Sequence, residues 1–151
     1  MRLTTFTDYS LRVLVYAATA PEGRVTIAEV AKAFGISQHH LVKVVHLLGR
    51  LGLLENTRGR NGGFKLARAP ADINVGAVLR ATEGDAVPAE CFHADGGSCP
   101  ITGACRLQKA LHEAVEAFHA VLDRYTLADL VANRRTLVGI LHGPYRMEPR
   151  V

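Results

Sequence analysis

The sequence predicts a mainly α-helical protein with one small β-hairpin. Three observations support this prediction: short amphipathic segments fill the first 50 residues, a basic turn joins two short strand patterns, and a longer helical pattern follows residue 104. The chain has 151 residues, which suits one domain or a small domain with an appendage, because domains most often have about 100–150 residues. No apolar run approaches the roughly 20 residues that a membrane helix needs. We therefore expect a cytoplasmic protein without a membrane partner.

The first part of the chain predicts three helices. Residues 7–20 are amphipathic, and Thr7 or Asp8 is placed to cap this helix. A second helix fits residues 26–34. Ser37 is a favourable N-cap for a third helix, which is expected to run to about residue 50.

A strand–turn–strand pattern follows these helices. Residues 53–57 and 64–67 flank the loop 58–63, which reads Arg-Gly-Arg-Asn-Gly-Gly. The Asn-Gly pair favours the positive φ angles of a tight hairpin turn. After this loop, Phe64 and Leu66 alternate with Lys65 and Ala67, as expected for a half-buried strand.

The second half of the chain predicts further helices at residues 75–82 and 104–125, and a short capped helix from Thr126. The longest of them carries an apolar stripe at helical spacing: Leu107, Leu111, Ala114, Phe118, Val121 and Tyr125. No regular structure is predicted beyond Arg134, so residues 134–151 are expected to form a tail, and disorder would fit it.

The pattern at residues 27–44 is that of a helix-turn-helix, although an ordinary pair of antiparallel helices has the same pattern. The basic hairpin that follows favours a winged helix-turn-helix. Charge agrees with this interpretation, because residues 1–70 hold ten Lys and Arg against four acidic residues, whereas residues 71–151 hold eight against ten. A basic first half is typical of an anion-binding module, although solvated faces can also differ in charge by chance. The sequence thus predicts a DNA-binding domain at 1–70 and a control region at 71–133.

The candidate DNA contacts lie on the third helix and in the wing. Residues at the start of a recognition helix reach base edges in the major groove, and arginine on a thin loop suits the narrow minor groove of A·T-rich DNA. Lys65 and Arg68 are expected to contact phosphates, which position a protein without reading sequence. Any single basic residue can instead be an ordinary solvated surface charge. The candidates are Ser37, Gln38, His39, His40, Lys43, Arg58, Arg60, Asn61, Gly62 and Lys65.

All three cysteines, Cys91, Cys99 and Cys105, lie in one window of the chain. An odd, clustered set argues against a disulfide framework and favours a metal or redox site. Neither gap matches the C-x2-C spacing of zinc fingers, and the glycines around the cysteines favour an iron–sulfur cluster over a single ion. His93 keeps a Cys₃His zinc site open as an alternative, and inert buried cysteines are a weaker one.

Together these motifs resemble the winged-helix iron–sulfur repressors, a family that includes IscR, RirA and NsrR. The resemblance covers the chain up to Asn133, and within the family it is greatest to the nitric-oxide-sensing, NsrR-like repressors. It rests on the opening Met-Arg-Leu-Thr-Thr-Phe-Thr-Asp-Tyr, the wing Arg-Gly-Arg-Asn-Gly-Gly, the stretch Cys-Pro-Ile-Thr-Gly-Ala-Cys-Arg-Leu and the late Tyr-Thr-Leu-Ala-Asp-Leu.

The resemblance implies a homodimer paired through the long helix. It also implies an iron–sulfur cluster, 2Fe–2S or 4Fe–4S, on Cys91, Cys99 and Cys105, with Asp8 of the partner subunit as the fourth ligand. The histidine that IscR-like proteins use three residues after the last cysteine is Gln108 in this chain. Arg12, one helical turn after Asp8, is expected to hold Asp8 or to balance the charge of the cluster.

The expected function is therefore a nitric-oxide-sensitive repressor. Its dimer is expected to bind palindromic, A·T-rich operator DNA while the cluster is intact and to release it on nitrosylation. The alternatives are a zinc-stabilised winged-helix protein that binds DNA or another partner, and a related regulator that senses iron or cluster status. We do not expect an enzyme, because neither a GxGxxG turn nor a catalytic triad is evident.

Overall fold

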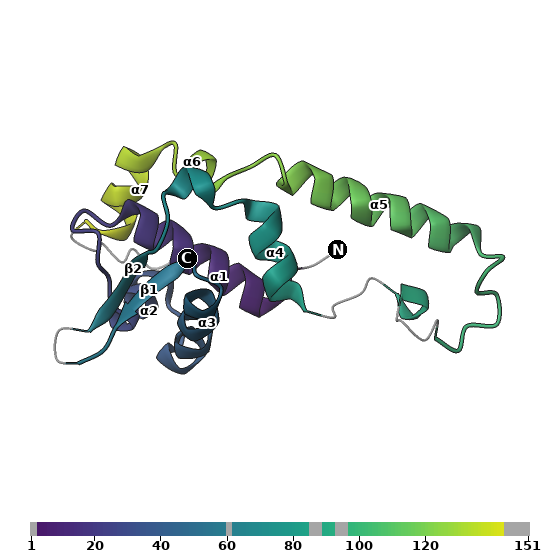
Figure 1. Cartoon of the computed structure of the whole chain (residues 1–151), viewed down its shortest axis with the longest axis horizontal. Coiled ribbons are helices and arrows are strands. Elements are labelled where there is room, and N and C mark those ends of the chain that lie inside the picture. Colours follow the sequence, from purple (N-terminus) through teal and green to yellow (C-terminus); the bar gives the residue numbers. More distant parts are fainter. Residues whose placement is uncertain (1–2, 60–61, 85–88, 93–96, 144–151) are drawn as a thin grey trace, which may run out of the picture.

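The computed structural model describes residues 3–59, 62–84, 89–92 and 97–143. It contains two strands, β1 (Leu54–Thr57) and β2 (Gly63–Leu66), among helices α1 (Thr5–Thr19), α2 (Ile27–Phe34), α3 (Gln38–Arg50), α4 (Val75–Glu83), α5 (Arg106–Leu122), α6 (Leu127–Leu130) and α7 (Arg134–Leu141). Two short 3₁₀ helices are η1 (Pro70–Asp72) and η2 (Glu90–Phe92). This mainly helical architecture with one antiparallel hairpin confirms the predicted fold class (Figure 1).

Helix α1 is the centre of the core. It contacts α3, α4, α6, α7 and β2, and eight of its 15 residues are buried. Large, fully buried side chains of the surrounding elements pack into the same cluster as Val13 and Leu14 of α1, among them Leu41, Leu48, Phe64, Ile73 and Leu127. Because α1 contacts so many elements, a shift of this helix would displace several of them.

The predicted cap of α1 was wrong. Thr4 is the N-cap, and its hydroxyl accepts a hydrogen bond from the Thr7 N–H at 3.2 Å. Thr7 is not at the cap because its own hydroxyl is buried and donates to the hydroxyl of Thr82 on α4 at 2.9 Å. Asp8 lies in the first turn, with its carboxylate outside the cap. The start of α1 is therefore attached to the end of α4.

Helices α2 and α3 form the predicted helix-turn-helix. A capping box starts α2, in which Thr26 and Glu29 bond each other's backbone N–H groups. Gly35 ends α2 with a φ of 65°, a conformation that favours glycine, and its N–H bonds the carbonyl of Ala31. Four α3 residues, Leu41, Val44, Val45 and Leu48, are buried. The opposite face of α3 is left to solvent.

The hairpin pairs Leu54 with Leu66 and Thr57 with Gly63, so β1 and β2 are antiparallel neighbours along their whole length. Phe64 fixes the hairpin to the body: it is 1% exposed and exchanges backbone hydrogen bonds with Val25 at 2.8 and 2.9 Å. A side chain at Gly63 would collide with the Val25 carbonyl, at 2.6 Å from the added Cβ. This close approach explains the second glycine of the Gly-Gly pair.

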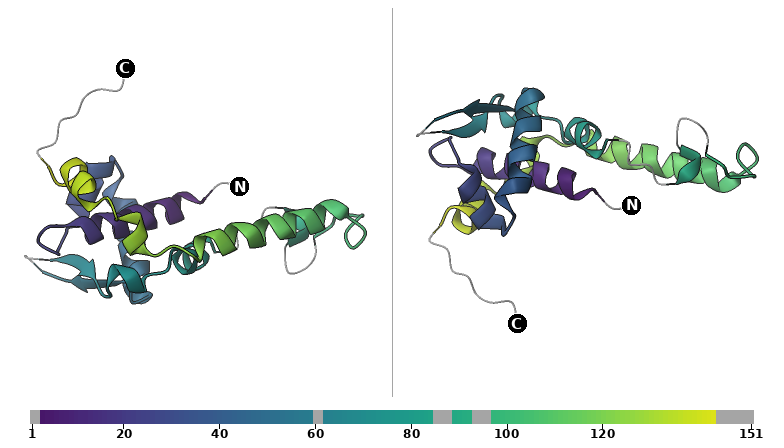
Figure 2. Two further views of the ribbon diagram at one scale, coloured as in Figure 1. Left: turned by 90° about the horizontal axis from the view of Figure 1, so that it is seen from above. Right: turned by 90° about the horizontal axis from the view of Figure 1, so that it is seen from below.

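Helix α5 leaves the body as an arm, which both views of Figure 2 show. Its base is fixed where Asn74, the N-cap of α4, donates to the carbonyl of Asp123 at 2.7 Å. Arg80 of α4 also forms an ion pair with Asp123. The bond from Arg80 lowers the pKa of Asp123. None of the 17 residues of α5 is buried.

Helix α7 corrects the expectation that no regular structure follows Arg134. It packs on α1 through the half-buried Leu137 and Leu141. The Arg134 guanidinium donates to the carbonyl of Ala18 at 2.7 Å, at the end of α1. Tertiary contacts of this kind stabilise a helix too short to be evident from its own sequence. The division into 1–70 and 71–133 stays a prediction.

Candidate nucleic-acid interface and cysteine site

The exposed face of α3 carries the candidate base contacts. Gln38, His39 and Lys43 are exposed because the buried stripe of α3 turns toward the core. Ser37 is the N-cap, but within the described residues its hydroxyl makes no capping hydrogen bond. The first turn of α3 therefore presents polar side chains whose donors and acceptors face outward, as base reading in a major groove requires.

His40 lies differently from its neighbours on α3. Its ring is 6.3 Å from the ring of Tyr9 on α1, measured between centroids. A hollow of about 390 Å³ between α1 and α3 is lined by Thr5, Phe6, Tyr9, His40, Lys43 and Val44. His40 thus faces the side of α3 next to α1. Tyr9, which directly follows Asp8 on α1, thus lies next to this side of the recognition helix α3.

The wing carries part of the predicted set. Arg58 is exposed at the end of β1, and Gly62 closes the turn by donating its N–H to the Gly59 carbonyl at 2.8 Å. Arg60 and Asn61 lie outside the described residues. The Lys65 ammonium is 3.2 Å from the Glu55 carboxylate across the hairpin.

Arg68, a predicted phosphate contact, is bonded to the end of α3 in this structure. Its Nε donates to the Gly52 carbonyl at 3.0 Å, and its Nη2 donates to the Leu51 carbonyl at 3.4 Å. A guanidinium at the end of a helix satisfies carbonyls that have no partner within the helix. Arg68 therefore stabilises the end of α3.

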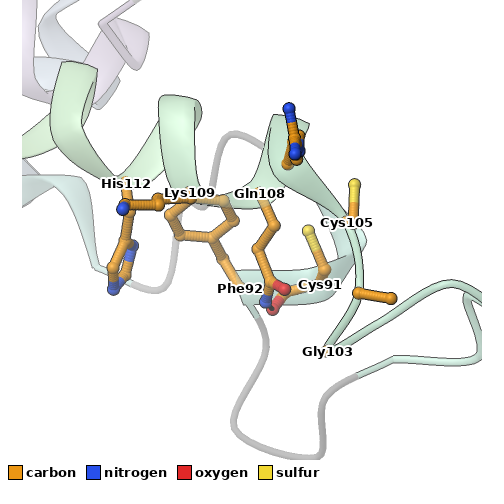
Figure 3. Close-up of a pocket in the computed structure, with 9 residues that line it drawn as sticks. Cys91, Phe92, Gly103, Cys105, Gln108, Lys109 and His112 are labelled. Atoms are coloured by element: carbon orange, nitrogen blue, oxygen red, sulfur yellow. Dashed lines mark hydrogen bonds between the residues drawn. The ribbon is translucent and has the colours of Figure 1, made fainter.

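The cysteine site lies where the free end of α5 meets η2. Cys91 and Cys105 line one hollow of about 420 Å³ (Figure 3). All three cysteines are unbridged and half-buried. Cys99 is not among the described residues that line the hollow. His93, the candidate zinc ligand, lies outside the described residues. The other lining residues are Phe92, Gly103, Ala104, Arg106, Gln108, Lys109 and His112.

Thiolates of the kind found at this hollow are ligands of both iron–sulfur clusters and zinc. Among the described residues, no three His, Cys, Asp or Glu side chains lie close enough to hold one metal ion. The hollow itself is lined by two thiols, those of Cys91 and Cys105. Arg106 and Lys109 place positive charge at its wall, which suits an anionic set of thiolates.

Asp8 and Arg12 form an ion pair on α1. The Nη2 of Arg12 is 2.9 Å from Oδ2 of Asp8, and its Nε donates to Oδ1 at 3.0 Å. The predicted role of Arg12 in holding Asp8 agrees with this geometry. Asp8 is not among the described residues that line the cysteine hollow of the same chain. Ligation by Asp8 of a second copy stays a prediction.

The sequence reasoning about ligands missed the contacts that two residues make at this site. Glu90 accepts from Ser98 and so joins the turns that carry Cys91 and Cys99. Gln108 donates to the backbone carbonyl of Cys91 at 3.2 Å. The available signal was position alone: Glu90 and Ser98 each come directly before a cysteine, and Gln108 follows Cys105 by one helical turn.

No helix in the described part of the chain is both long and apolar enough to cross a membrane.

The chain is similar to known regulators of transcription. A family model described as "Rrf2: Iron-dependent Transcriptional regulator" matches residues 3–133. An "HTH-type transcriptional regulator NsrR" from Geobacillus kaustophilus is 52% identical over 142 residues, which cover 93% of this chain and 97% of the relative. The protein of that name from Bacillus subtilis is 46% identical over 142 residues, with the same coverage.

Solved structures agree with the fold. The IscR of T. potens has a TM-score of 0.66 at 29% identity, covering 88% of each chain. CymR, described as the global cysteine regulator of B. subtilis, has a TM-score of 0.65 at 28% identity and covers 88% of this chain and 98% of its own.

Proposed function

The chain belongs to the Rrf2 family of transcriptional regulators, and from this premise we propose that it is a nitric-oxide-sensitive repressor whose DNA affinity depends on an iron–sulfur cluster. One observation carries the proposal most directly: α1 bears Asp8 near its start and packs along the recognition helix α3. A single helix thus joins the predicted cluster ligand to the predicted DNA-reading surface. Membership of this family assigns the chain to regulators rather than to enzymes.

The DNA-reading surface combines α3 with the wing. Gln38 and His39 are exposed at the start of α3, where side chains of a recognition helix meet base edges. Arg58 and Lys65 extend the basic surface along the hairpin. Contacts from these cations to phosphates would hold the register, and the first turn of α3 would supply the sequence preference.

A second copy would cover the apolar face of α5. Leu107 is 65% exposed and Val121 is 43% exposed, although both belong to the apolar stripe of that helix. A long amphipathic helix with an uncovered stripe is stable when it packs against a partner. Pairing two copies of α5 would also place two recognition helices in one assembly, as a palindromic operator requires.

The cluster would be held by Cys91, Cys99 and Cys105 of one copy and by Asp8 of the partner subunit. When bound, an iron–sulfur cluster supplies iron that reacts with nitric oxide. Arg106 and Lys109 would balance the negative charge of the thiolates at the wall of the hollow.

Asp8 would couple the cysteine site to DNA binding. In this structure its carboxylate is paired with Arg12, whose guanidinium carbon also lies 5.6 Å from the ring centre of Phe34. Phe34 is the last residue of α2, directly before the Gly35 turn. When the partner subunit's cysteine site binds the Asp8 carboxylate, the carboxylate gives up its bonds to Arg12. Because Arg12 lies over the ring of Phe34, this loss reaches the turn between α2 and α3.

Anaerobic purification followed by operator binding tests the proposed function. The loaded protein should be brown and contain iron and sulfide. It should bind a duplex that it selects from a random DNA pool, and nitric oxide should bleach it and lower its affinity for that duplex. The same protein treated with the spent nitric oxide donor is the control.

Two outcomes contradict the proposal. DNA affinity that stays the same after complete bleaching rules out nitric oxide sensing. Colourless protein with one zinc ion per chain supports the zinc-stabilised alternative instead.

A further inference from the structure

Glu90 connects the turns that carry the first two cysteines. Its Oε1 accepts a hydrogen bond from the Ser98 N–H at 2.9 Å and another from the Ser98 hydroxyl at 2.7 Å. Glu90 directly precedes Cys91, and Ser98 directly precedes Cys99. One carboxylate oxygen thus brings together two segments that are eight residues apart. The backbone N–H and the hydroxyl of Ser98 together fix both the position and the rotation of its turn.

The backbone at Gly97 is shaped to fit against Glu90. Gly97 has a φ of 64°, which strongly favours glycine. A Cβ at this position would lie 2.7 Å from Cγ of Glu90 and 2.9 Å from its carbonyl oxygen. The turn before Cys99 therefore lies directly against Glu90, so the hydrogen bonds to Ser98 belong to a close packing contact.

Gln108 and His112 attach η2 to α5. Gln108 Nε2 donates to the Cys91 carbonyl at 3.2 Å, and the ring of His112 packs edge-on against Phe92 with 4.9 Å between centroids. Gln108 and His112 lie one turn apart on α5, beyond Cys105. Figure 3 shows Gln108 beside Cys91 and His112 beside Phe92. These contacts fix Cys91 relative to Cys105.

We propose that Glu90 and Gln108 are positioning residues that bring the cysteine segments together before any metal binds. Glu90 sets Cys91 against Cys99, and Gln108 sets Cys91 against Cys105. This inference rests on the proposed function, since it concerns the site assigned there to the cluster. Without these bonds, the cysteine segments would have to lose conformational entropy while the cluster assembles. With them, the segments are already ordered before it binds.

The metal-free protein tests the role of Glu90 without any cluster. In a Cys105→Ser background, dibromobimane joins the thiols of Cys91 and Cys99, and its fluorescence reports when both have reacted. We expect Glu90→Ala to slow the second, intramolecular reaction about tenfold, because orientation raises the effective concentration of a thiol. Monobromobimane rates on single-cysteine versions correct for changes in the reactivity of each thiol.

Two matched variants separate position from charge. Glu90→Gln removes the same charge as Glu90→Ala but keeps an acceptor oxygen for Ser98, so it should cross-link nearly as fast as the parent. Glu113→Ala removes an exposed carboxylate from α5 and should have no effect. Equal cross-linking in Glu90→Ala and the parent overturns the role of Glu90, and so does equal slowing in Glu90→Gln.

Gln108 is tested with the other thiol pair. In a Cys99→Ser background, Gln108→Leu keeps a side chain of similar size but loses the donor to the Cys91 carbonyl. We expect it to slow the cross-linking of Cys91 and Cys105 several-fold. An unchanged rate overturns the role of Gln108.

The cluster-loaded protein supplies the second readout. In the three-cysteine chain, we expect Glu90→Ala to lose iron to a chelator about 10–100-fold faster than the wild type, the range typical of residues that orient metal ligands. The melting temperature of the metal-free form should not change. Rapid iron loss from Glu90→Ala but not from Glu90→Gln supports the inference. Iron loss from Glu90→Ala at the rate of the wild type, or at the rate of Glu90→Gln, overturns it. A wild-type protein that takes up no iron or sulfide contradicts the proposed function, while the thiol cross-linking still decides the roles of Glu90 and Gln108.

Discussion

Arg12 binds the carboxylate of Asp8 at both oxygens, through Nε at 3.0 Å and Nη2 at 2.9 Å. The two residues are four apart on α1, a spacing that brings side chains together on one face of a helix. Both side chains are 42% exposed, so water and salt weaken the attraction between them. The pair contributes about 0.5 kcal/mol to stability at most, as expected for exposed helical ion pairs. Because the ion pair adds so little stability, its importance must lie in the other partners that the Asp8 carboxylate can bind.

Replacing Asp8 by alanine should uncouple the cysteine site from DNA binding. In the wild type we expect cluster loading to change operator affinity about 5–150-fold, the usual range of allosteric coupling. In Asp8→Ala the loaded and metal-free forms should bind with equal affinity, measured by fluorescence anisotropy. Glu22→Ala, which removes an exposed carboxylate after the end of α1, is the control and should keep the coupling. Full coupling in Asp8→Ala would show that α1 does not transmit the signal through this residue.

Lys65 and Glu55 should have opposite effects on DNA binding. Their charged groups are 3.2 Å apart on the hairpin, so Glu55 competes with phosphate for the ammonium of Lys65. Lys65→Ala should weaken binding to all duplexes and lower the slope of log affinity against log salt by about 1. Glu55→Gln should strengthen binding at the same salt concentrations. If both variants bind as the wild type does, the wing is not part of the interface.

Gly76 should not tolerate a side chain. An added Cβ would overlap the carboxylate of Asp123 and approach its backbone nitrogen to 3.0 Å. Gly76→Ala should therefore lower the free energy of unfolding by about 1–3 kcal/mol, as overpacking usually does. Gly139→Ala is the matched control: its Cβ would meet nothing within 4 Å in helix α7. It should raise stability by about 0.5–1 kcal/mol, and urea unfolding measures both.

His142 should make stability depend on pH. Burial lowers its pKa from the ordinary 6.5, so the folded state disfavours the protonated ring. This contribution to stability is fully present above pH 6.5 and is lost as the pH falls through the lowered pKa. The ring packs 4.2 Å from Tyr16, its Nε2 is 3.0 Å from the Thr19 hydroxyl, and the charges of Glu29 and Arg134 act on it.

The measurement compares urea unfolding at pH 7.5 and pH 5.5. The loss of stability between these values should be smaller in His142→Gln than in the wild type. His46→Gln, on the exposed face of α3, should lose as much as the wild type. An equal loss in His142→Gln would mean that another group causes the pH dependence.

Helices with a strong pattern and clear caps were predicted closely from the sequence. The ends of α2, α3 and α4 are determined by neighbouring residues, such as the capping box at Thr26 and the glycine at position 35. The cap of α1 was mistaken because Thr4, Thr7 and Asp8 have similar local preferences. A contact with Thr82, 75 residues away, decides which of them is free to cap.

The cysteine site could be predicted in composition but not in arrangement. The sequence indicates three thiols and predicts a metal group that soft ligands hold, because both follow from residue types. The hydrogen bonds of Glu90 and Gln108 depend on how η2 folds back on α5, and no local pattern encodes that contact. The same holds for α7, because its Arg134 bonds Ala18 of α1, which is 116 residues away in the sequence.

The junction of α4 with α5 limits how far the cysteine site can move relative to the body of the protein. A helix of 17 residues is about 25 Å long, so a swing of about 5° at its base displaces its far end by about 2 Å. The bonds of Asn74 and Arg80 to Asp123 act at that base. Small angular changes there are magnified at the thiols. Variation at these three positions would therefore move the thiols relative to the body of the protein without changing any cysteine.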